Sequence, residues 1–220
     1  MSWNIKAITF DFDGVIVADS EYIKEDSWEA VIAELGESAR QPLATTRQTF
    51  SKGKGSRFDI IEAALKDLKM PATEIIAAVP RLAQVYNRAV QTAILEKGIR
   101  PVDREGIAAL AKHCPLYINS ATPEIAVQET VRRLGVELFF KGVFGQPTKK
   151  VENLQRVIAE ENIKPMEMLF VGDGDGDVAA ATEAGCRFIG LANSWNKWQS
   201  PKLFPLIANL TEALAILTKV

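Results

Sequence analysis

Short apolar segments rich in β-branched and aromatic residues recur along this 220-residue chain, and each is followed by turn residues and a helix-like pattern. Their length and composition are typical of strands that are buried on both faces. Strands that alternate with helices predict a parallel α/β sheet, in which ligands bind beyond the carboxyl ends of the strands. The predicted strands are residues 5–10, 115–120, 142–145, 168–172 and 186–192.

A second region, residues 18–97, interrupts this alternation. It contains helix-like patterns and no convincing strand pattern. We therefore expect an α/β core formed by residues 1–17 and 98–220, with an inserted helical domain formed by residues 18–97. The predicted helices of the insertion are residues 20–36, 57–69 and 73–96.

Composition and charge exclude several classes of protein. The chain has 47% hydrophobic and 25% charged residues and a net charge of −2, so it lacks the basic field that attracts nucleic acid or anionic lipid. No apolar run reaches the roughly 18 residues that span a bilayer, and the first residues lack the pattern of a signal peptide. We expect a cytoplasmic monomer or homodimer without nucleic-acid or membrane partners.

Histidine and cysteine are scarce, which narrows the chemistry further. His113 is the single histidine, so a two-histidine zinc motif cannot form. Cys114 and Cys186 are not part of a CxxC pair, and each is expected to be a free thiol. The chain also lacks the glycine-rich motifs of P-loop and dinucleotide-binding proteins.

Aspartates follow two of the predicted strands. Asp11 and Asp13 come after the first strand, and Asp173, Asp175 and Asp177 alternate with glycines after a later one. Because the carboxyl ends of parallel strands meet at one edge, these carboxylates should converge on one crevice, where their charges repel. A hard divalent cation would relieve this repulsion. Mg²⁺ prefers few carboxylates together with water and phosphate oxygens, so the pattern favours Mg²⁺ and phosphoryl chemistry.

Two other strand ends carry candidate phosphate-binding groups. Thr122 suits the N-cap of a helix that begins at Pro123, which leaves the Ser120 hydroxyl available near a helix N-terminus, where phosphate binds. Lys149 and Lys150 precede another helix, although the helix dipole disfavours cations there, and a bound anion would explain them. The alternative is that one or both are solvated surface lysines, which we expect for Lys149. Lys150 is the preferred anion ligand because it lies directly before the helix.

Four ordered motifs resemble those of the haloacid dehalogenase superfamily of phosphohydrolases. They are Asp-Phe-Asp-Gly-Val, Ile-Asn-Ser, a lysine before a helix, and Gly-Asp-Gly-Asp-Gly-Asp followed by Val-Ala-Ala-Ala-Thr-Glu-Ala-Gly. The resemblance covers essentially the whole chain and points to proteins like phosphoglycolate phosphatase and β-phosphoglucomutase. It implies a Rossmann-like α/β core with a helical cap inserted at residues 18–97.

The resemblance also implies roles for individual residues. Asp11 is expected to be the nucleophile that forms an aspartyl-phosphate, and Asp13 the general acid and base. Ser120 and Lys150 are expected to bind the transferring phosphoryl group. The implied Mg²⁺ ligands are Asp11, the main-chain carbonyl of Asp13, Asp173 and Asp177.

Three features depart from the family pattern. Gly174 stands where serine is common, the stretch after Gly14 is one residue longer than usual, and the neighbouring Lys149 leaves the lysine motif ambiguous. Asp175 occupies a variable family position, and we assign it to the turn rather than to the metal site.

Asp13 favours phosphoryl transfer, because dehalogenase members lack the second aspartate of this motif. The predicted function is a Mg²⁺-dependent phosphatase that acts on a small anionic phosphorylated metabolite. One alternative is a sugar phosphomutase, although the insertion has no histidine of the kind that such mutases use to gate the acid–base aspartate. The other is a catalytically inactive member that binds a protein through its cap.

The insertion contains a basic segment, residues 38–58, without acidic residues. We predict a flexible lid in which Arg57, part of a Gly-Ser-Arg sequence like that of the mutases, binds a second anionic group of the substrate. The alternative is a solvated loop. The basic residues of the segment are Arg40, Arg47, Lys52, Lys54 and Arg57.

Trp195 and Trp198 follow the last predicted strand, and we expect them to pack at the sheet edge rather than to form a partner surface.

Overall fold

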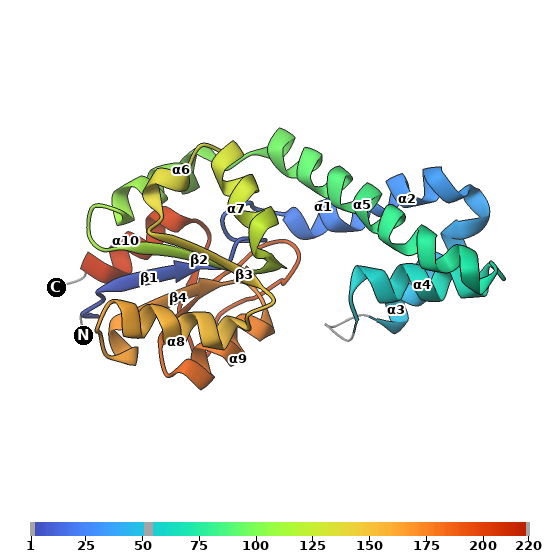
Figure 1. The fold of residues 1–220 in the computed structure, drawn as a ribbon. Helices are drawn as coiled ribbons and strands as arrows, with labels where there is room; N and C mark the ends of the chain where they lie inside the picture. The colour runs from blue at the N-terminus through green and yellow to red at the C-terminus, as the bar shows by residue number, and fades with distance from the viewer. Residues whose placement is uncertain (1–2, 51–54, 219–220) are drawn as a thin grey trace. The chain divides into compact units, whose positions relative to one another are not determined.

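The computed structural model describes residues 3–50 and 55–218. The chain divides into two compact units, which are labelled element by element in Figure 1. Met1–Glu21 and Leu95–Val220 form the α/β unit, and Tyr22–Ile94 form the helical unit.

These limits lie three to four residues inside the predicted insertion, residues 18–97. The reason is that two helices cross the boundaries. Helix α1 (Ser20–Asp26) begins in the α/β unit, where Ser20 is buried and its Oγ accepts a hydrogen bond from the Gly14 N–H at 2.8 Å. Helix α5 (Ala72–Lys97) ends in the same unit.

The α/β unit contains one sheet of six strands in the order β3-β2-β1-β4-β5-β6, and every neighbouring pair is parallel. The structure confirms the predicted α/β fold and all five predicted strands. The two-residue β6 was not predicted, because so short a strand has no recognisable period. The bounds are β1 Ala7–Phe10, β2 Leu116–Pro123, β3 Gly142–Gln146, β4 Met168–Gly172, β5 Arg187–Leu191 and β6 Leu206–Ile207.

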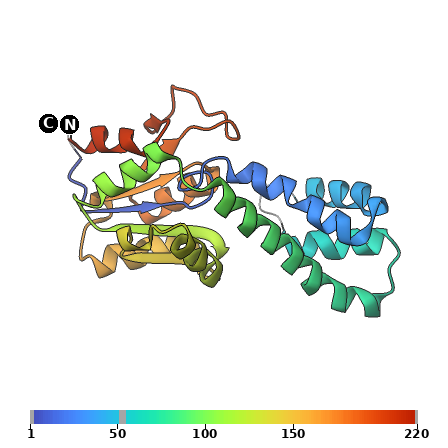
Figure 2. The ribbon, with the colours of Figure 1, turned by 90° about the horizontal axis from the view of Figure 1, so that it is seen from above.

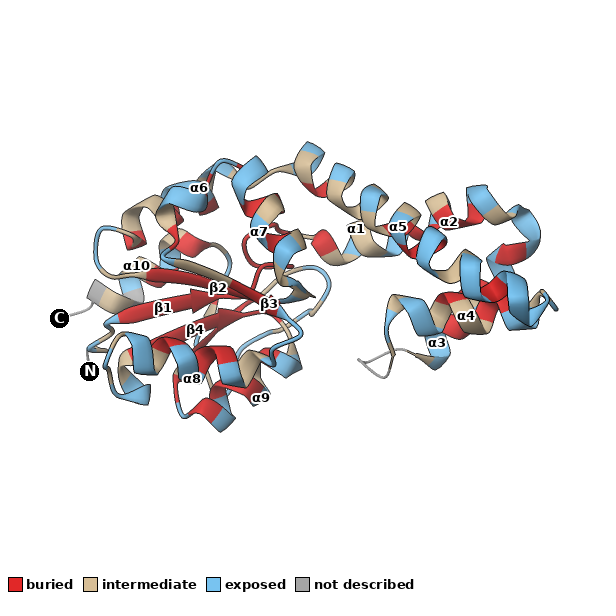
Figure 3. Ribbon diagram, in the orientation of Figure 1, coloured by how far each residue is buried: buried red, intermediate tan, exposed pale blue. Residues whose placement is uncertain are grey.

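Helices cover both faces of this sheet, as Figure 1 shows, with α6 and α10 on one face and α8 and α9 on the other. The central strands β1 and β4 are buried along their whole length (Figure 3), which explains their uninterrupted apolar sequences. The bounds of these helices and of α7 are α6 Pro101–Leu110, α7 Glu124–Arg133, α8 Lys150–Glu160, α9 Asp175–Ala184 and α10 Leu210–Thr218.

The helical unit has an apolar core of its own. Trp28 of α2 packs on Tyr86 of α5 with ring centroids 4.4 Å apart. Figure 2 shows the helices of this unit from a second side. Leu43, Ile61 and Leu65 are fully buried in the same core. Its helices, besides α1 and α5, are α2 Trp28–Leu35, α3 Arg40–Thr49 and α4 Arg57–Asp67.

The prediction of a flexible lid at residues 38–58 is wrong for Arg40–Thr49, which form helix α3. Leu43 and Thr46 are buried along one side of this helix, so packing against the helical core orders a segment whose composition resembles a loop. Lys52 and Lys54 lie outside the described residues.

Among the residues that are described, no helix has the length and apolar composition needed to cross a bilayer.

Candidate active site

The central strands β1 and β4 end side by side, and an aspartate follows each. Asp11 comes directly after β1, and Asp173 comes directly after β4. Phe10 is the register partner of Val171, and the Asp11 N–H donates to the Val171 carbonyl at 2.8 Å. Parallel pairing therefore brings both carboxylates to the same edge of the sheet.

Three carboxylates gather at this edge, those of Asp11, Asp173 and Asp177, which we call the acidic cluster. One oxygen atom from each lies within 4.8 Å of the others, and no member is more than 7% exposed. Closely spaced carboxylate oxygens are the ligands that hard divalent cations prefer. The donor set of the acidic cluster therefore fits Mg²⁺.

Lys150 reaches the acidic cluster from the first turn of α8. Its Nζ atom lies 2.9 Å from Asp11 Oδ2 and 2.6 Å from Asp177 Oδ1, so one ammonium bridges two of the carboxylates. Lys149 is exposed and lies just before α8. Of the two adjacent lysines, the geometry thus brings Lys150 to the strand ends.

Burial dominates the electrostatics of the acidic cluster. It raises the pKa of Asp11 well above its usual value; Asp177 adds to this rise, and Lys150 opposes it. Burial also raises the pKa of Asp173 to about 7, against a hydrogen bond from Asn193 that lowers it. The pKa of Lys150 is raised overall. Burial alone would lower this pKa, but the nearby carboxylates of Asp11 and Asp177 outweigh burial. One ammonium does not offset these carboxylates, and a divalent cation would supply the missing positive charge.

The turn after β4 is built around the Asp177 carboxylate, which requires a glycine at position 172. Asp177 lies in the first turn of α9, and its Oδ2 accepts hydrogen bonds from the N–H groups of Gly174 at 3.0 Å and Asp173 at 3.2 Å. A carboxylate in this position also interacts favourably with the helix dipole. A side chain at Gly172 would collide with Asp177. Asp175 is exposed and outside the acidic cluster, and it is the first residue of α9 rather than part of the turn.

Gly14 is required by the same crowding on the β1 side. Its φ of +73° is a left-handed conformation, and a Cβ atom there would collide with the Asp173 carboxylate. Glycine at the end of the Asp-Phe-Asp-Gly motif therefore lets the loop after β1 approach the loop after β4.

Asp13 and Ser120 are both buried, but Ser120 lies within β2 rather than at its end, and the structure corrects the predicted role of Thr122. Strand β2 continues to Pro123, which pairs with Gln146 of β3, and α7 begins only at Glu124. Because strand pairing holds this segment extended, Thr122 does not cap the helix. Its Oγ1 instead donates to Asp13 Oδ2 at 3.3 Å, and its N–H donates to Ser120 Oγ at 3.0 Å.

Sequence reasoning missed two residues of this site, Asn193 and Asn196 in the loop after β5. The Asn193 side chain donates to the Asp173 carboxylate at 2.7 Å, and the Asn196 side chain donates to the Asp173 carbonyl at 2.9 Å. The available signal was their place directly after a predicted strand, the position that also marks Asp11 and Asp173. Trp198 packs with Phe188 and Phe204 as predicted, and Trp195 is exposed.

Arg57 belongs to the helical unit, where it is the first residue of α4. Its guanidinium donates to Asn87 Oδ1 of α5 and lies 5.9 Å from the centre of the Tyr86 ring. Arg47 of the same unit forms an ion pair with Glu25 and lies over the Trp28 ring. These contacts hold both guanidinium groups within the helical unit.

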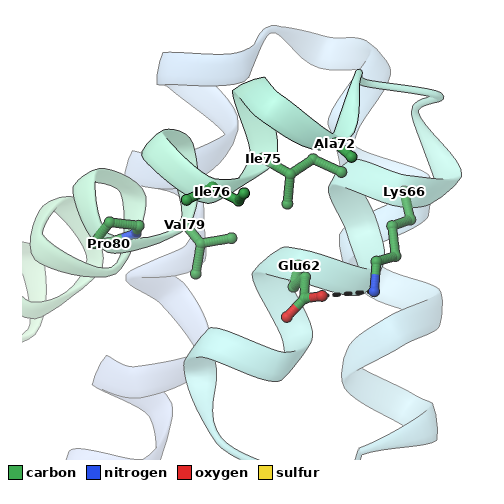
Figure 4. Close-up of a pocket in the computed structure, with 7 residues that line it drawn as sticks. All are labelled: Glu62, Lys66, Ala72, Ile75, Ile76, Val79 and Pro80. Carbon is green, nitrogen blue, oxygen red and sulfur yellow. Dashed lines mark ion pairs between the residues drawn. The ribbon is translucent and has the colours of Figure 1, made fainter.

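A groove of about 360 Å³ also lies in the helical unit, between α4 and α5 (Figure 4). Its wall is mostly apolar, with Ile75, Ile76 and Val79 from α5, and it contains the ion pair of Glu62 with Lys66 at 2.6 Å. Both side chains of this ion pair are about half exposed or more, in contrast to the buried carboxylates of the acidic cluster. The arrangement suited to catalysis is therefore the strand-end site of the α/β unit.

Comparison with known proteins agrees with this geometry. The family model described as haloacid dehalogenase-like hydrolase matches residues 5–185. The chain belongs to this family. Phosphoglycolate phosphatase of Escherichia coli K12 is 30% identical over 166 residues, a region that covers 72% of this chain and 60% of that enzyme.

Two solved structures share the fold over nearly the whole chain. A candidate β-phosphoglucomutase of Thermotoga maritima has a TM-score of 0.72 and 18% identity, and the match covers 98% of this chain and 100% of that one. A haloacid dehalogenase-like hydrolase of Bacillus subtilis, YfnB, which is bound to magnesium, has a TM-score of 0.70 and 20% identity, covering 97% and 99%. Membership of the family and its phosphatase relatives confirm the resemblance and the prediction of a hydrolase of the phosphatase type.

Proposed function

We propose that this protein is a Mg²⁺-dependent phosphatase that removes phosphate from a small anionic metabolite by way of a phosphorylated Asp11. The observation that carries the proposal is the acidic cluster at the ends of β1 and β4, bridged by Lys150. A buried carboxylate beside a cation-binding group and an ammonium suits phosphoryl transfer, in which charge on the phosphoryl oxygens must be neutralised.

Asp11 and Asp13 carry the proposed bond changes. A carboxylate oxygen of Asp11 attacks phosphorus, the bond from phosphorus to the leaving oxygen breaks, and Asp13 donates a proton to that oxygen. A water molecule then attacks the phosphorus atom of the phosphorylated Asp11, and Asp13 accepts a proton from this water. The bond between phosphorus and Asp11 breaks, which releases phosphate and restores the carboxylate.

Thr122 and Lys150 support these two residues. The hydrogen bond from Thr122 holds one oxygen of Asp13, and Lys150 forms an ion pair with the nucleophilic carboxylate of Asp11. Lys150 and the buried Ser120 hydroxyl are the proposed donors to the phosphoryl oxygens. The three carboxylates of the acidic cluster and the Asp13 main-chain carbonyl would hold Mg²⁺, which neutralises charge on the phosphoryl group when bound.

The proposed substrate carries a second anionic group besides its phosphate. The Escherichia coli relative is named for phosphoglycolate, a phosphate ester with a carboxylate. Arg57 is the proposed ligand for that second group, because a guanidinium binds a carboxylate or phosphate through two parallel hydrogen bonds. In this proposal the helical unit, Tyr22–Ile94, serves as a substrate-recognising cap.

A sugar phosphomutase is the second candidate, favoured by the fold shared with the Thermotoga maritima protein. The composition of the helical unit argues against it, because the single histidine of the chain, His113, follows α6 in the α/β unit. An inactive binding protein is a remote alternative, because the residues expected for catalysis, Asp11, Asp13, Ser120 and Lys150, are all present.

Both cysteines are free thiols, which supports the further proposal of a cytoplasmic location.

The decisive experiment measures phosphate release from an aryl phosphate, with Mg²⁺ and with a chelator, for the wild type and for Asp11→Asn. We expect release only with Mg²⁺, and a loss of at least about 1,000-fold in the variant, because its amide cannot act as nucleophile. Asp175→Asn is the matched control and should retain activity. Unchanged turnover in Asp11→Asn would refute the proposal, and an isomeric sugar phosphate as product would favour the mutase.

A further inference from the structure

The loop that follows β5, Asn193–Trp198, is folded by its own two asparagine side chains. Asn193 Oδ1 accepts hydrogen bonds from the N–H groups of Trp195 at 3.0 Å and Asn196 at 2.8 Å. Asn196 Oδ1 accepts from the N–H groups of Asn193 at 3.2 Å and Trp198 at 3.0 Å. These turns use the acceptor of each side chain and leave its amide donors for other partners.

Those donors are directed at Asp173. Asn193 Nδ2 donates to Asp173 Oδ2 at 2.7 Å, and Asn196 Nδ2 donates to the Asp173 main-chain carbonyl at 2.9 Å. Asn196 Nδ2 also donates to the Leu191 carbonyl at 2.9 Å, at the end of β5. The loop therefore holds the side chain and the backbone of Asp173 and ties both to the adjacent strand.

Asp173 needs such support more than an ordinary carboxylate does. It is buried in a cluster with two other carboxylates, and the ammonium of Lys150 pairs with Asp11 and Asp177. Repulsion would favour rotation of the Asp173 side chain away from the cluster. An amide donor on one of its oxygens opposes this rotation without adding a positive charge that would compete with a cation.

We propose that Asn193 and Asn196 are positioning residues that hold Asp173 in the orientation needed to bind the divalent cation. This inference rests on the proposed function. Groups that orient a metal ligand change metal affinity by about 10- to 100-fold when they are removed. Loss of the Asn193 donor should thus weaken Mg²⁺ binding in this range and leave turnover at saturating Mg²⁺ within about threefold of the wild type.

The test uses calorimetric titration of the full chain with Mg²⁺ alone, together with the Mg²⁺ dependence of aryl phosphate hydrolysis. Asn193→Ala removes both the turn and the donor. Asn193→Ser is the sharper variant, because a serine hydroxyl can still accept the turn hydrogen bonds but is too short to reach Asp173. Ser194→Ala is the matched control in the same loop, since the Ser194 hydroxyl donates to Asp19 rather than to Asp173.

We expect Asn193→Ser to bind Mg²⁺ about 10- to 100-fold more weakly, with cooperative unfolding in metal-free buffer close to that of the wild type, and Ser194→Ala to bind normally. Equal Mg²⁺ affinity of wild type and folded Asn193→Ser would overturn the inference and leave the proposed function standing. A wild type that neither binds Mg²⁺ nor releases phosphate would overturn both. A loss of turnover at saturating Mg²⁺ without a change in Mg²⁺ affinity would also overturn the positioning role.

Discussion

The α/β unit buries a group of like charges, whereas the ion pairs of the helical unit are largely exposed. In the α/β unit the three carboxylates of the acidic cluster are buried at strand ends, with one ammonium among them. In the helical unit the ion pairs lie near the surface. Arg40, for example, bridges Glu29 and Glu37, and all three side chains are about half exposed or more.

This difference distinguishes charges that form a functional site from charges on the surface of a folded unit. Exposed ion pairs contribute about 0–1 kcal/mol each, so the stability of the helical unit rests on its apolar core. Burying like charges together lowers stability, and such an arrangement is typical of functional sites. The α/β unit tolerates it because it has an apolar core of its own, between the sheet and helices α8 and α9.

The largest expected effect tests whether each unit depends on its own core. Leu65 of α4 is fully buried in the helical unit, and Leu65→Ala should reduce the stability of that unit by about 2–5 kcal/mol. Hydrogen exchange should then accelerate in α2–α5 and stay unchanged in the sheet. Leu154→Ala in α8 is the matched change in the α/β unit and should give the reverse pattern. Equal acceleration in both units after either change would show that their cores are coupled.

The next prediction compares a buried with an exposed aspartate of one turn. Asp173→Asn should raise the Mg²⁺ concentration needed for half-maximal activity by about 10- to 100-fold, because a charged oxygen ligand is lost. Asp175→Asn should change it little, since Asp175 is exposed at the start of α9. A larger effect at Asp175 would show that the register assigned to the last motif is incorrect.

A third prediction concerns the contribution of the helical unit to specificity. Arg57→Ala should reduce kcat/KM for a substrate with two anionic groups by about 10- to 100-fold, equivalent to about 1.4–2.7 kcal/mol, because a bidentate contact is lost. An aryl phosphate has no second anion and should be hydrolysed almost normally. The informative quantity is the ratio of the two losses, and equal losses would exclude a role for Arg57 in recognising the second anion.

The smallest expected effect is a pH dependence of stability that originates in the acidic cluster. The pKa of Asp173 is about 7 in the folded protein, against an ordinary value of 3.8. Between these values the folded state binds more protons than the unfolded chain, so the free energy of unfolding falls as the pH rises from about 4 to about 7.

Asp173→Asn should remove most of this decline in metal-free protein, because its side chain does not titrate. Urea unfolding of wild type and variant at several pH values measures the difference. Parallel stability curves would contradict the prediction.

Much of the fold and part of the site could be predicted from local patterns. Buried parallel strands are uninterrupted apolar runs, and residues directly after two such strands must lie at the same sheet edge if the strands are neighbours. That reasoning was sufficient for Asp11 and Asp173. The prediction for the basic segment was wrong because its composition indicated a loop. Helix α3 is instead ordered by burial of Leu43 and Thr46, which depends on contacts distant in the sequence.

The sequence by itself determined which residue types stand at the ends of β1, β2 and β4, since strand runs and the turns after them are local patterns. Only the tertiary structure decided which of them meet. The choice of Lys150 over Lys149 depends on the direction in which α8 starts, and the bond from Thr122 to Asp13 depends on β2 pairing as far as Pro123. The support of Asp173 by Asn193 joins residues 20 positions apart across adjacent strands, a contact that no local pattern records.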